Sequence, residues 1–289
     1  MTISMESFGL TDVGRVRKSN EDQFLIADLA KSMKLQHTSL PHSDHVRLFG
    51  HFHGSLLLVA DGMGGHESGE KASGLAIRTV IEYVLNMMPW FYRFQENQSG
   101  LEAELKTVLE ECQRKVSAAS EESAGRKRMG TTLTMAYILW PQLYVVHAGD
   151  SRCYLIRDGQ IHQVTHDHTV AQQLLDRGLL TAEQAERSRL SHVLWNCIGG
   201  GSQTINPDVY QAQLEEGDML LLCSDGLSKY VSDQAILNVL KKDESVEAAV
   251  RQLVNAALDA GGKDNITVVI GRATSEARTP TLTRECVTL

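Results

Sequence analysis

The sequence predicts an α+β fold in which β-sheets form the framework and helices cover them. Six apolar segments end in turn-forming residues, as strands do, and three other segments show the spacing of amphipathic helices. The strand segments occur in groups between the helices and do not alternate with them, which favours layered α+β packing. A chain of 289 residues, 42% hydrophobic and without a Gly/Ser/Pro-rich linker, is expected to form one domain.

The predicted strands are short apolar runs that stop at Gly, Asp or Ser. The clearest pair is the hairpin CYLIRDGQIHQVT, in which Asp158-Gly159 is the turn signal. The other segments are SLLLVADG (55–62), TTLTMAYIL (131–139), LYVVHAGD (143–150), DMLLLCSDG (218–226) and NITVVIG (265–271).

The predicted helices span residues 68–88, 101–119 and about 244–259. In the first, Ile77, Val80 and Val84 follow three-and-four spacing, which predicts an apolar face packed on a sheet. The third is expected to stop at Gly261-Gly262.

The domain is expected to cover residues 1–272, followed by a polar C-terminal tail at 273–289. Two segments look inserted. Residues 30–54 hold five of the eleven histidines without periodicity; a solvated loop is favoured there over a transition-metal site. Residues 166–204 combine helix-like sequence with a Gly-Gly-Gly run, which is typical of a mobile flap.

Composition excludes several classes of protein. Lys and Arg number 28 against 36 Asp and Glu, and the net charge of -8 argues against nucleic-acid binding. No apolar run has the roughly 20 residues of a membrane span, and no signal peptide is visible. The five cysteines are widely spaced with no C-x-x-C pair, which is typical of free thiols in a reducing compartment. A cytoplasmic monomer without a membrane partner is therefore expected.

Acidic residues recur where strands begin or end. They are Asp61 before Gly62, Asp150 after Gly149, Asp225 before Gly226, Asp264 before the last strand, and the pair Glu21-Asp22 before a short apolar run. Each Asp-Gly alone is most simply turn chemistry. If the strand ends share one edge, however, the clustered carboxylates would repel each other unless cations lie between them.

The candidate ligands are oxygens, which favours Mg²⁺ or Mn²⁺ over zinc or copper. Two such cations activate water and neutralise phosphoryl oxygens, which is the chemistry of phosphoester hydrolysis. Arg17 lies five residues before Asp22 and is a candidate to bind the phosphate through its guanidinium, although an isolated arginine is more often a surface residue.

Seven ordered motifs carry a family resemblance: GRVRKSNED, VADGMGGHESGEKAS, GTTL, AGDSRCYLIRDG, THDHT, CSDGL and KDNITVV. Over residues 9–271 the chain resembles the bacterial branch of the metal-dependent (type 2C) serine/threonine protein phosphatases. The resemblance implies a four-layer αββα sandwich, with two antiparallel sheets flanked by helices and a binuclear Mn²⁺ or Mg²⁺ centre at one end. It also implies hydrolysis of phosphoserine and phosphothreonine in proteins, in opposition to a eukaryotic-like Ser/Thr kinase.

The resemblance implies a role for each acid. Asp61 would bridge both metals and the Gly62 carbonyl would be a further ligand. Asp225 and Asp264 would complete the first metal's shell, and Glu21 and Asp22 would hold the second metal directly or through water. Asp150, with Asp225, would hold a third, weaker metal, Arg17 would bind the phosphate, and Asn265 would support the loop of Asp264. A hydroxide bridging the metals would attack in line.

The sequence departs from the family at three places. Met63 stands where many eukaryotic members carry a histidine that acts as a general acid, and His66 is the nearest imidazole, so the acid is unassigned. Residues 192–201, HVLWNCIGGG, lack the usual pattern at the end of the flap. The segment 30–54 is longer than expected between the first two strands.

Several other interpretations were weighed. A cysteine-based phosphatase is excluded because none of the five cysteines has Arg six positions later. GGHESGEK departs from a nucleotide-binding loop at Glu70. THDH (165–168) is read as the loop entering the flap in preference to a metal pair. A catalytically silent phosphoprotein-binding module and an enzyme for small phosphoesters remain the functional alternatives.

Overall fold

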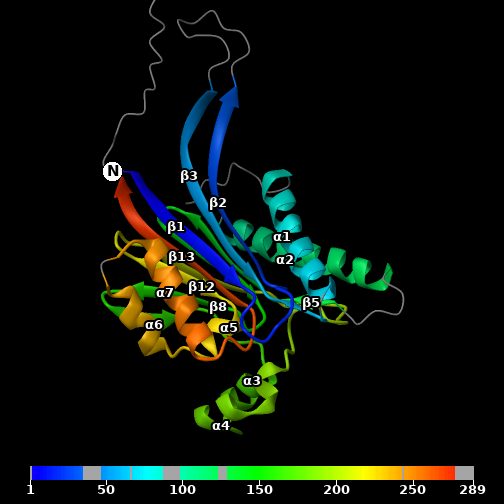
Figure 1. Ribbon diagram of the computed structural model, residues 1–289. Helices are drawn as coiled ribbons and strands as arrows, with labels where there is room; N and C mark the ends of the chain where they lie inside the picture. The colour runs from blue at the N-terminus through cyan, green and yellow to red at the C-terminus, as the bar shows by residue number, and fades with distance from the viewer. Residues whose placement is uncertain are drawn as a thin grey trace, which may run out of the picture.

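Two five-stranded antiparallel sheets stack face to face in the computed structural model, which describes residues 2–34, 47–65, 67–86, 98–122, 129–242 and 244–276. Each sheet carries helices on its outer face (Figure 1). The first sheet has the order β1 (Thr2–Asp12), β13 (Ile266–Glu276), β12 (Met219–Cys223), β8 (Arg152–Arg157) and β9 (Gln160–Gln163). The second has the order β11 (Asp208–Gln213), β7 (Gln142–Ala148), β6 (Leu133–Leu139), β3 (Arg47–Ala60) and β2 (Gln23–Lys34).

The helices form the two outer layers, which completes the predicted αββα sandwich. The first pair, α1 (Glu67–Asn86) and α2 (Gln98–Glu122), packs on the second sheet, while α6 (Asp233–Leu240) and α7 (Val246–Asp259) cover the first (Figure 1). The short α5 (Asp225–Ser228) directly follows β12. The helices predicted at 68–88, 101–119 and 244–259 correspond to α1, α2 and α7.

Strand alternation explains why the run at 56–60 is apolar throughout. Successive side chains of a strand point to opposite faces. Leu57 and Val59 pack between the two sheets, whereas Leu56 and Leu58 pack beneath α1 and α2. Because both faces of β3 are buried, every position of this run is apolar, and Asp61 is the first residue beyond the core.

The hairpin of β2 and β3 corrects the prediction for residues 30–54. Pairing continues from Gln23↔Ala60 to Lys34↔Arg47, with an irregularity between Ala30 and Ser32. Both ends of the His-rich segment are therefore strand, and the hairpin extends beyond the body of the sandwich (Figure 1). His37, His42 and His45 lie outside the described residues.

The C-terminal boundary also differs from the prediction. β13 continues to Glu276 and pairs with β1 along its whole length, and Ala273 is buried. Residues 273–276, predicted as the start of the tail, thus belong to the first sheet, and 277–289 lie outside the described part of the chain.

A small helical unit occupies the predicted flap. It contains α3 (Val170–Asp176), α4 (Ala182–Arg187) and a 3-10 turn, η1 (Arg189–His192), and it projects from one end of the sandwich (Figure 1). Thr169 and Thr181 cap α3 and α4 with their hydroxyls. After the flap, β10 (Ile198–Gly199) joins β5 (Gly130–Thr131) and β4 (Gly62–Met63) in a third, small sheet.

None of the helices in the described ranges is long and apolar enough to cross a membrane.

Candidate active site

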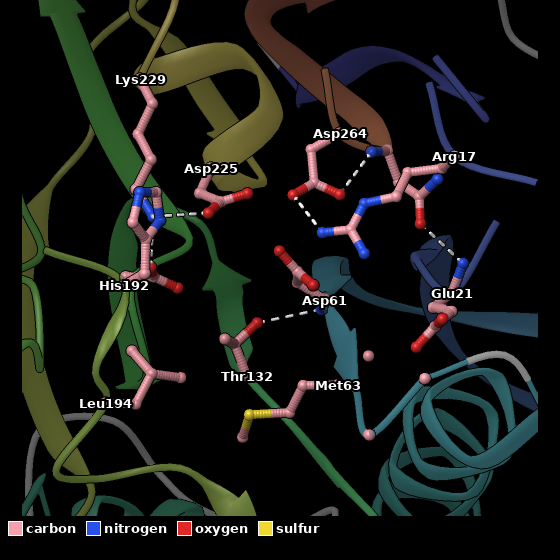
Figure 2. Close-up of a pocket in the computed structure, with 15 residues that line it drawn as sticks. Arg17, Glu21, Asp61, Met63, Thr132, His192, Leu194, Asp225, Lys229 and Asp264 are labelled. Atoms are coloured by element: carbon pink, nitrogen blue, oxygen red, sulfur yellow. Dashed lines mark hydrogen bonds and ion pairs between the residues drawn. The ribbon is translucent and has the colours of Figure 1, made fainter. Parts of the chain in front are cut away.

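The predicted acids meet at one end of the sandwich, around a cleft of about 220 Å³. Figure 2 shows Asp61, Asp225 and Asp264 on its walls, with Arg17 and Glu21 on the side formed by the loop between β1 and β2. This arrangement follows from antiparallel topology, because β3, β7 and β12 end, and β2 and β13 begin, at the same edge. The other lining residues are Gly62, Met63, Gly64, Gly65, Thr132, Asp150, His192, Leu194, Lys229 and Asn265.

Asp61 is fixed through its backbone by Thr131 and Thr132, at the end of β5. Thr132 Oγ1 accepts a hydrogen bond from the Asp61 N–H at 2.9 Å, and the Thr132 N–H donates to the Asp61 carbonyl at 2.9 Å. Thr131 Oγ1 donates to the same carbonyl at 2.9 Å. The carboxylate of Asp61 takes no part in these bonds, so the backbone is held while the side chain faces the cleft (Figure 2).

Gly62 has no room for a side chain. A Cβ there would collide with the carbonyl oxygens of Gly69 and Glu21, so the chain can pass between α1 and the Glu21 loop only as glycine.

The charges in the cleft favour bound cations. Burial, then the carboxylates of Asp22 and Asp225, raise the pKa of Asp61 well above its usual value. Burial, together with Asp225 and Asp264, raises the pKa of Asp22 to about 7 despite a hydrogen bond from Thr267. The crowded, buried carboxylates therefore favour proton binding at Asp61 and Asp22, and oxygen-only donors at this density suit a hard divalent cation.

Asp22 lies below the cleft and supplies a second indication. It is 1% exposed, and its Oδ2 accepts from Thr267 Oγ1 at 2.7 Å. Within the described part of the chain, its Oδ1 is a buried polar atom without a hydrogen-bond partner. Such an atom is costly unless it has a ligand, so it fits a position next to a cation or a water molecule bound to one.

Arg17 lies at the rim, where Nη2 forms an ion pair with Asp264 Oδ2 at 2.7 Å. The hydrogen bond to Asp264 is the main reason why the pKa of Arg17 is raised. The side chain is half-exposed, so its guanidinium is accessible to a ligand entering the cleft.

Asn265 holds the loop that carries Arg17 and Glu21. Its Oδ1 accepts from the Glu21 N–H at 2.9 Å, and its Nδ2 donates to the carbonyls of Val13 at 2.9 Å and Ser19 at 3.0 Å. The sequence predicted that Asn265 supports the loop of Asp264. Its backbone N–H does bind Asp264 Oδ1 at 2.9 Å, but its side chain supports the opposite loop.

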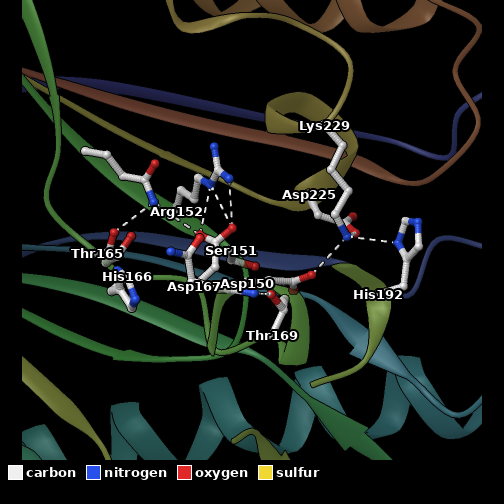
Figure 3. A network of polar contacts seen from close by, with 12 residues as sticks. Asp150, Ser151, Arg152, Thr165, His166, Asp167, Thr169, His192, Asp225 and Lys229 are labelled. Atoms are coloured by element: carbon white, nitrogen blue, oxygen red, sulfur yellow. Dashed lines mark hydrogen bonds and ion pairs between the residues drawn. The ribbon is translucent and has the colours of Figure 1, made fainter. Parts of the chain in front are cut away.

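The third-metal position predicted between Asp150 and Asp225 contains a lysine side chain. Lys229 Nζ donates to Asp150 Oδ2 at 3.0 Å and to Asp225 Oδ2 at 2.6 Å, as Figure 3 shows. Burial opposes the charge of Lys229, but the two carboxylates outweigh it and hold its pKa above the usual value. Burial, then Asp225, raises the pKa of Asp150 to about 6.

The flap is attached to the end of β7 by a buried polar network. The N–H of His168 donates to the Gly149 carbonyl at 2.7 Å, and the N–H of Trp195 donates to the His168 carbonyl at 3.0 Å. Asp167 accepts two bonds from Arg152 Nε and Nη2 at 2.9 and 2.8 Å (Figure 3). THDH therefore forms the loop that enters the flap, as predicted, and Arg152 binds its aspartate, Asp167.

The departures from the family pattern lie around the cleft. Met63 lines it and has no acidic proton, whereas His66 lies outside the described residues. His192 and Leu194, from the unusual end of the flap, also line the cleft. The flap thus contributes an imidazole, that of His192, to the wall of the cleft.

Sequence reasoning gave no role to Thr132, His192 or Lys229. The signal for Thr132 was the motif GTTL, whose hydroxyls hold Asp61. The signal for Lys229 was its spacing of four residues from Asp225, which places two side chains on the same helical face.

Comparisons with known proteins agree with this geometry. The family model described as Protein phosphatase 2C matches residues 34–269. The serine/threonine protein phosphatase PstP of Mycobacterium tuberculosis is 38% identical over 217 residues, which cover 74% of this chain and 40% of PstP. The chain thus matches less than half the length of PstP. Protein phosphatase PhpP of Streptococcus pneumoniae is 33% identical over 274 residues, 92% of this chain and 96% of PhpP.

Solved structures show the same architecture. The crystal structure of the M. tuberculosis phosphatase PstP/Ppp superposes with a TM-score of 0.74 and 32% identity, covering 94% of this chain and 99% of that one. The catalytic domain of PstP in complex with two manganese ions gives a TM-score of 0.73 and 31% identity, covering 95% and 100%.

Proposed function

This chain belongs to the protein phosphatase 2C family, and we propose that it hydrolyses phosphoserine and phosphothreonine in proteins with Mn²⁺ or Mg²⁺ as cofactor. The observation that carries the proposal is the convergence of Asp61, Asp225, Asp264 and Glu21 with Arg17 on one cleft. Similarity to a phosphatase whose structure contains two manganese ions supports the cofactor. The complete set of acids argues against a catalytically silent phosphoprotein-binding module.

We assign the metal pair to the oxygens at the end of the sandwich. Asp61 and the Gly62 carbonyl, with Asp225 and Asp264, would hold the first cation, and Asp61 would be shared with a second held through Glu21 and Asp22. When bound, the pair supplies the Lewis acidity that activates a water molecule and neutralises the phosphoryl group.

The chain's own residues orient the substrate around this pair. Arg17 engages Asp264 through Nη2, and its guanidinium has further N–H donors on Nε and Nη1. These donors suit bidentate binding of a phosphate. Asn265 keeps the Arg17 loop in place, and Thr132 keeps Asp61 in place, so the phosphate-binding and metal-binding groups have a fixed separation.

The substrates are proposed to be cytoplasmic phosphoproteins made by a serine/threonine kinase. PstP of Mycobacterium tuberculosis is named a serine/threonine protein phosphatase, which supports the substrate class. The reducing compartment is supported by Cys112, Cys153, Cys197 and Cys223, which are free and buried.

The test is hydrolysis of a phosphothreonine peptide by metal-stripped protein after Mn²⁺, Mg²⁺ or Ca²⁺ is restored. Mn²⁺ or Mg²⁺ should restore turnover in the wild type but not in Asp61→Asn. Asp158→Asn is the matched control, because Asp158 lies in the β8–β9 turn and takes no part in the cleft.

Protein that binds Mn²⁺ and the phosphopeptide without turnover would identify a binding module instead. Hydrolysis of small phosphoesters with no activity on phosphopeptides would identify the third candidate, an enzyme for small molecules.

A further inference from the structure

The ammonium group of Lys229 lies between two of the acids of the cleft. Its Nζ is 3.0 Å from Asp150 Oδ2 and 2.6 Å from Asp225 Oδ2. The side chains of Asp150 and Asp225 are 7% and 14% exposed, and that of Lys229 is 20% exposed. The ammonium group of Lys229 therefore lies between Asp150 and Asp225, the carboxylates to which the family resemblance assigned a third metal.

Local structure delivers Lys229 to this position. Asp225 opens α5 and Lys229 follows its last residue, so the two are one helical turn apart on the same face. The N–H of Lys229 also donates to the Asp225 carbonyl at 3.0 Å, which closes that turn. Asp150 approaches from the other side, after Gly149, whose φ of 129° produces the sharp turn at the end of β7.

A third partner comes from the flap. Lys229 Nζ lies 3.0 Å from His192 Nδ1, on η1 (Figure 3). An ammonium has three donors, and here each has an acceptor: two carboxylate oxygens and one imidazole nitrogen. A divalent cation of this class needs about six oxygen ligands, most of them water at a site with two carboxylates. The ammonium group of Lys229, with two carboxylate oxygens and one imidazole nitrogen around it, does not match a coordination shell of about six oxygens.

We propose that Lys229 takes the place of a third metal ion in this protein, so that the chain binds two catalytic cations and supplies the third positive charge itself. The inference rests on the metal pair of the proposed function. Lys229 is a positioning residue: it neutralises Asp150, holds Asp225 through Oδ2, and ties η1 of the flap to the edge of the cleft.

The Lys229 ammonium differs from a bound metal ion in its charge and in its permanent attachment to the chain. A covalently attached ammonium carries one positive charge, where a metal carries two, and it does not dissociate. The contact between His192 and the cleft therefore persists at any concentration of free cation. The position of this part of the flap is set by the chain itself.

Metal counting tests the proposal without requiring turnover. After equilibrium dialysis against saturating Mn²⁺, elemental analysis should find two Mn²⁺ per wild-type chain and three per Lys229→Gln chain. The added ion should disappear in the double variant Lys229→Gln/Asp150→Asn. Lys106→Gln is the matched control. Lys106 forms an i,i+4 ion pair with Glu102 on the solvent-facing side of α2, so its replacement should leave the count at two.

Three Mn²⁺ in the wild type, falling to two in Asp150→Asn, would overturn the proposal, as would a count of two in folded Lys229→Gln. If Lys229→Gln does not fold, anomalous scattering from wild-type crystals grown with Mn²⁺ decides the question. A peak between Asp150 and Asp225 would reject the proposal, and lysine density there with two peaks at the metal pair would support it.

Hydrogen exchange tests the contact between Lys229 and His192 of the flap. Amide hydrogen exchange across 189–193 should become faster in Lys229→Gln and remain unchanged in Lys106→Gln. Inactive protein that nevertheless binds two Mn²⁺ would contradict the proposed function and leave this inference standing.

Discussion

Asn265→Ala tests whether one buried side chain holds the loop that carries Arg17. Asn265 is 6% exposed, and its amide makes three hydrogen bonds, all to backbone groups of the loop between β1 and β2. At about 1 kcal/mol for each bond, their loss should reduce the free energy of unfolding by about 3 kcal/mol. For a domain of this size that corresponds to a fall of about 6 °C in the melting temperature.

The assay is urea and thermal unfolding in the presence of a chelator, so that a change in metal affinity does not contribute. Asn238→Ala is the control, because Asn238 lies exposed on α6 and its side chain is bound only by the neighbouring Gln234 among the described residues. Equal unfolding midpoints for the two variants would refute the reasoning. The Michaelis constant of Asn265→Ala should also rise, because Arg17 loses its fixed position.

Three further predictions concern the cleft. Asp61→Asn should abolish metal-dependent turnover, since Asp61 is the ligand assigned to both cations; full activity would reject the assignment. Arg17→Ala should raise the Michaelis constant about 10- to 100-fold, from the loss of a charged hydrogen bond of about 1.5–3 kcal/mol, whereas exposed Arg15→Ala should not. In chelator, the raised pKa of Asp22, about 7, means that the folded state keeps a proton that the unfolded chain has released. Stability of the metal-free protein should therefore fall as the pH rises from about 4 to about 7, and Asp22→Asn should flatten this dependence.

The predictions for Arg17 and Asp22 each have a clear opposing result. An unchanged Michaelis constant in Arg17→Ala would show that the arginine does not bind the phosphate. Metal-free stability that rises over the same pH range would show that Asp22 is ionised in the folded state. Addition of Mn²⁺ should remove most of the pH dependence, because the bound cations neutralise the carboxylates.

The core of the fold and the acids of the site could be predicted because their signals are local. β3, β6, β7 and β12 are apolar runs, and an acid follows β3, β7 and β12 within two residues, at Asp61, Asp150 and Asp225. The sequence of β1, TISMESFGLTD, is mixed because this strand lies at the edge of its sheet, so it gave no clear signal. Residues 30–54 predict a loop, and not the outer part of the β2–β3 hairpin, because their histidines hide the alternation.

The roles of Lys229 and Asn265 depend on contacts between distant segments. In sequence, Lys229 is an ordinary lysine one turn after Asp225; its second carboxylate, Asp150, lies 79 residues away. The partners of Asn265 lie about 250 residues away, at Val13 and Ser19. The pairing of β1 with β13 brings Asn265 to its partners, and the packing of the two sheets brings Asp150 to Lys229; no local sequence pattern encodes either contact.

The pairing of β1 with β13 has a consequence for synthesis of the protein. The Arg17–Asp264 ion pair and the Asp22–Thr267 hydrogen bond each join residues about 245 positions apart. While the chain is being translated, every segment before β13 can be present and the cleft still lacks Asp264, Asn265 and the partner strand of β1. The proposed activity is thus available only to chains that already include β13, because a product that stops before β13 lacks Asp264, Asn265 and the strand that pairs with β1.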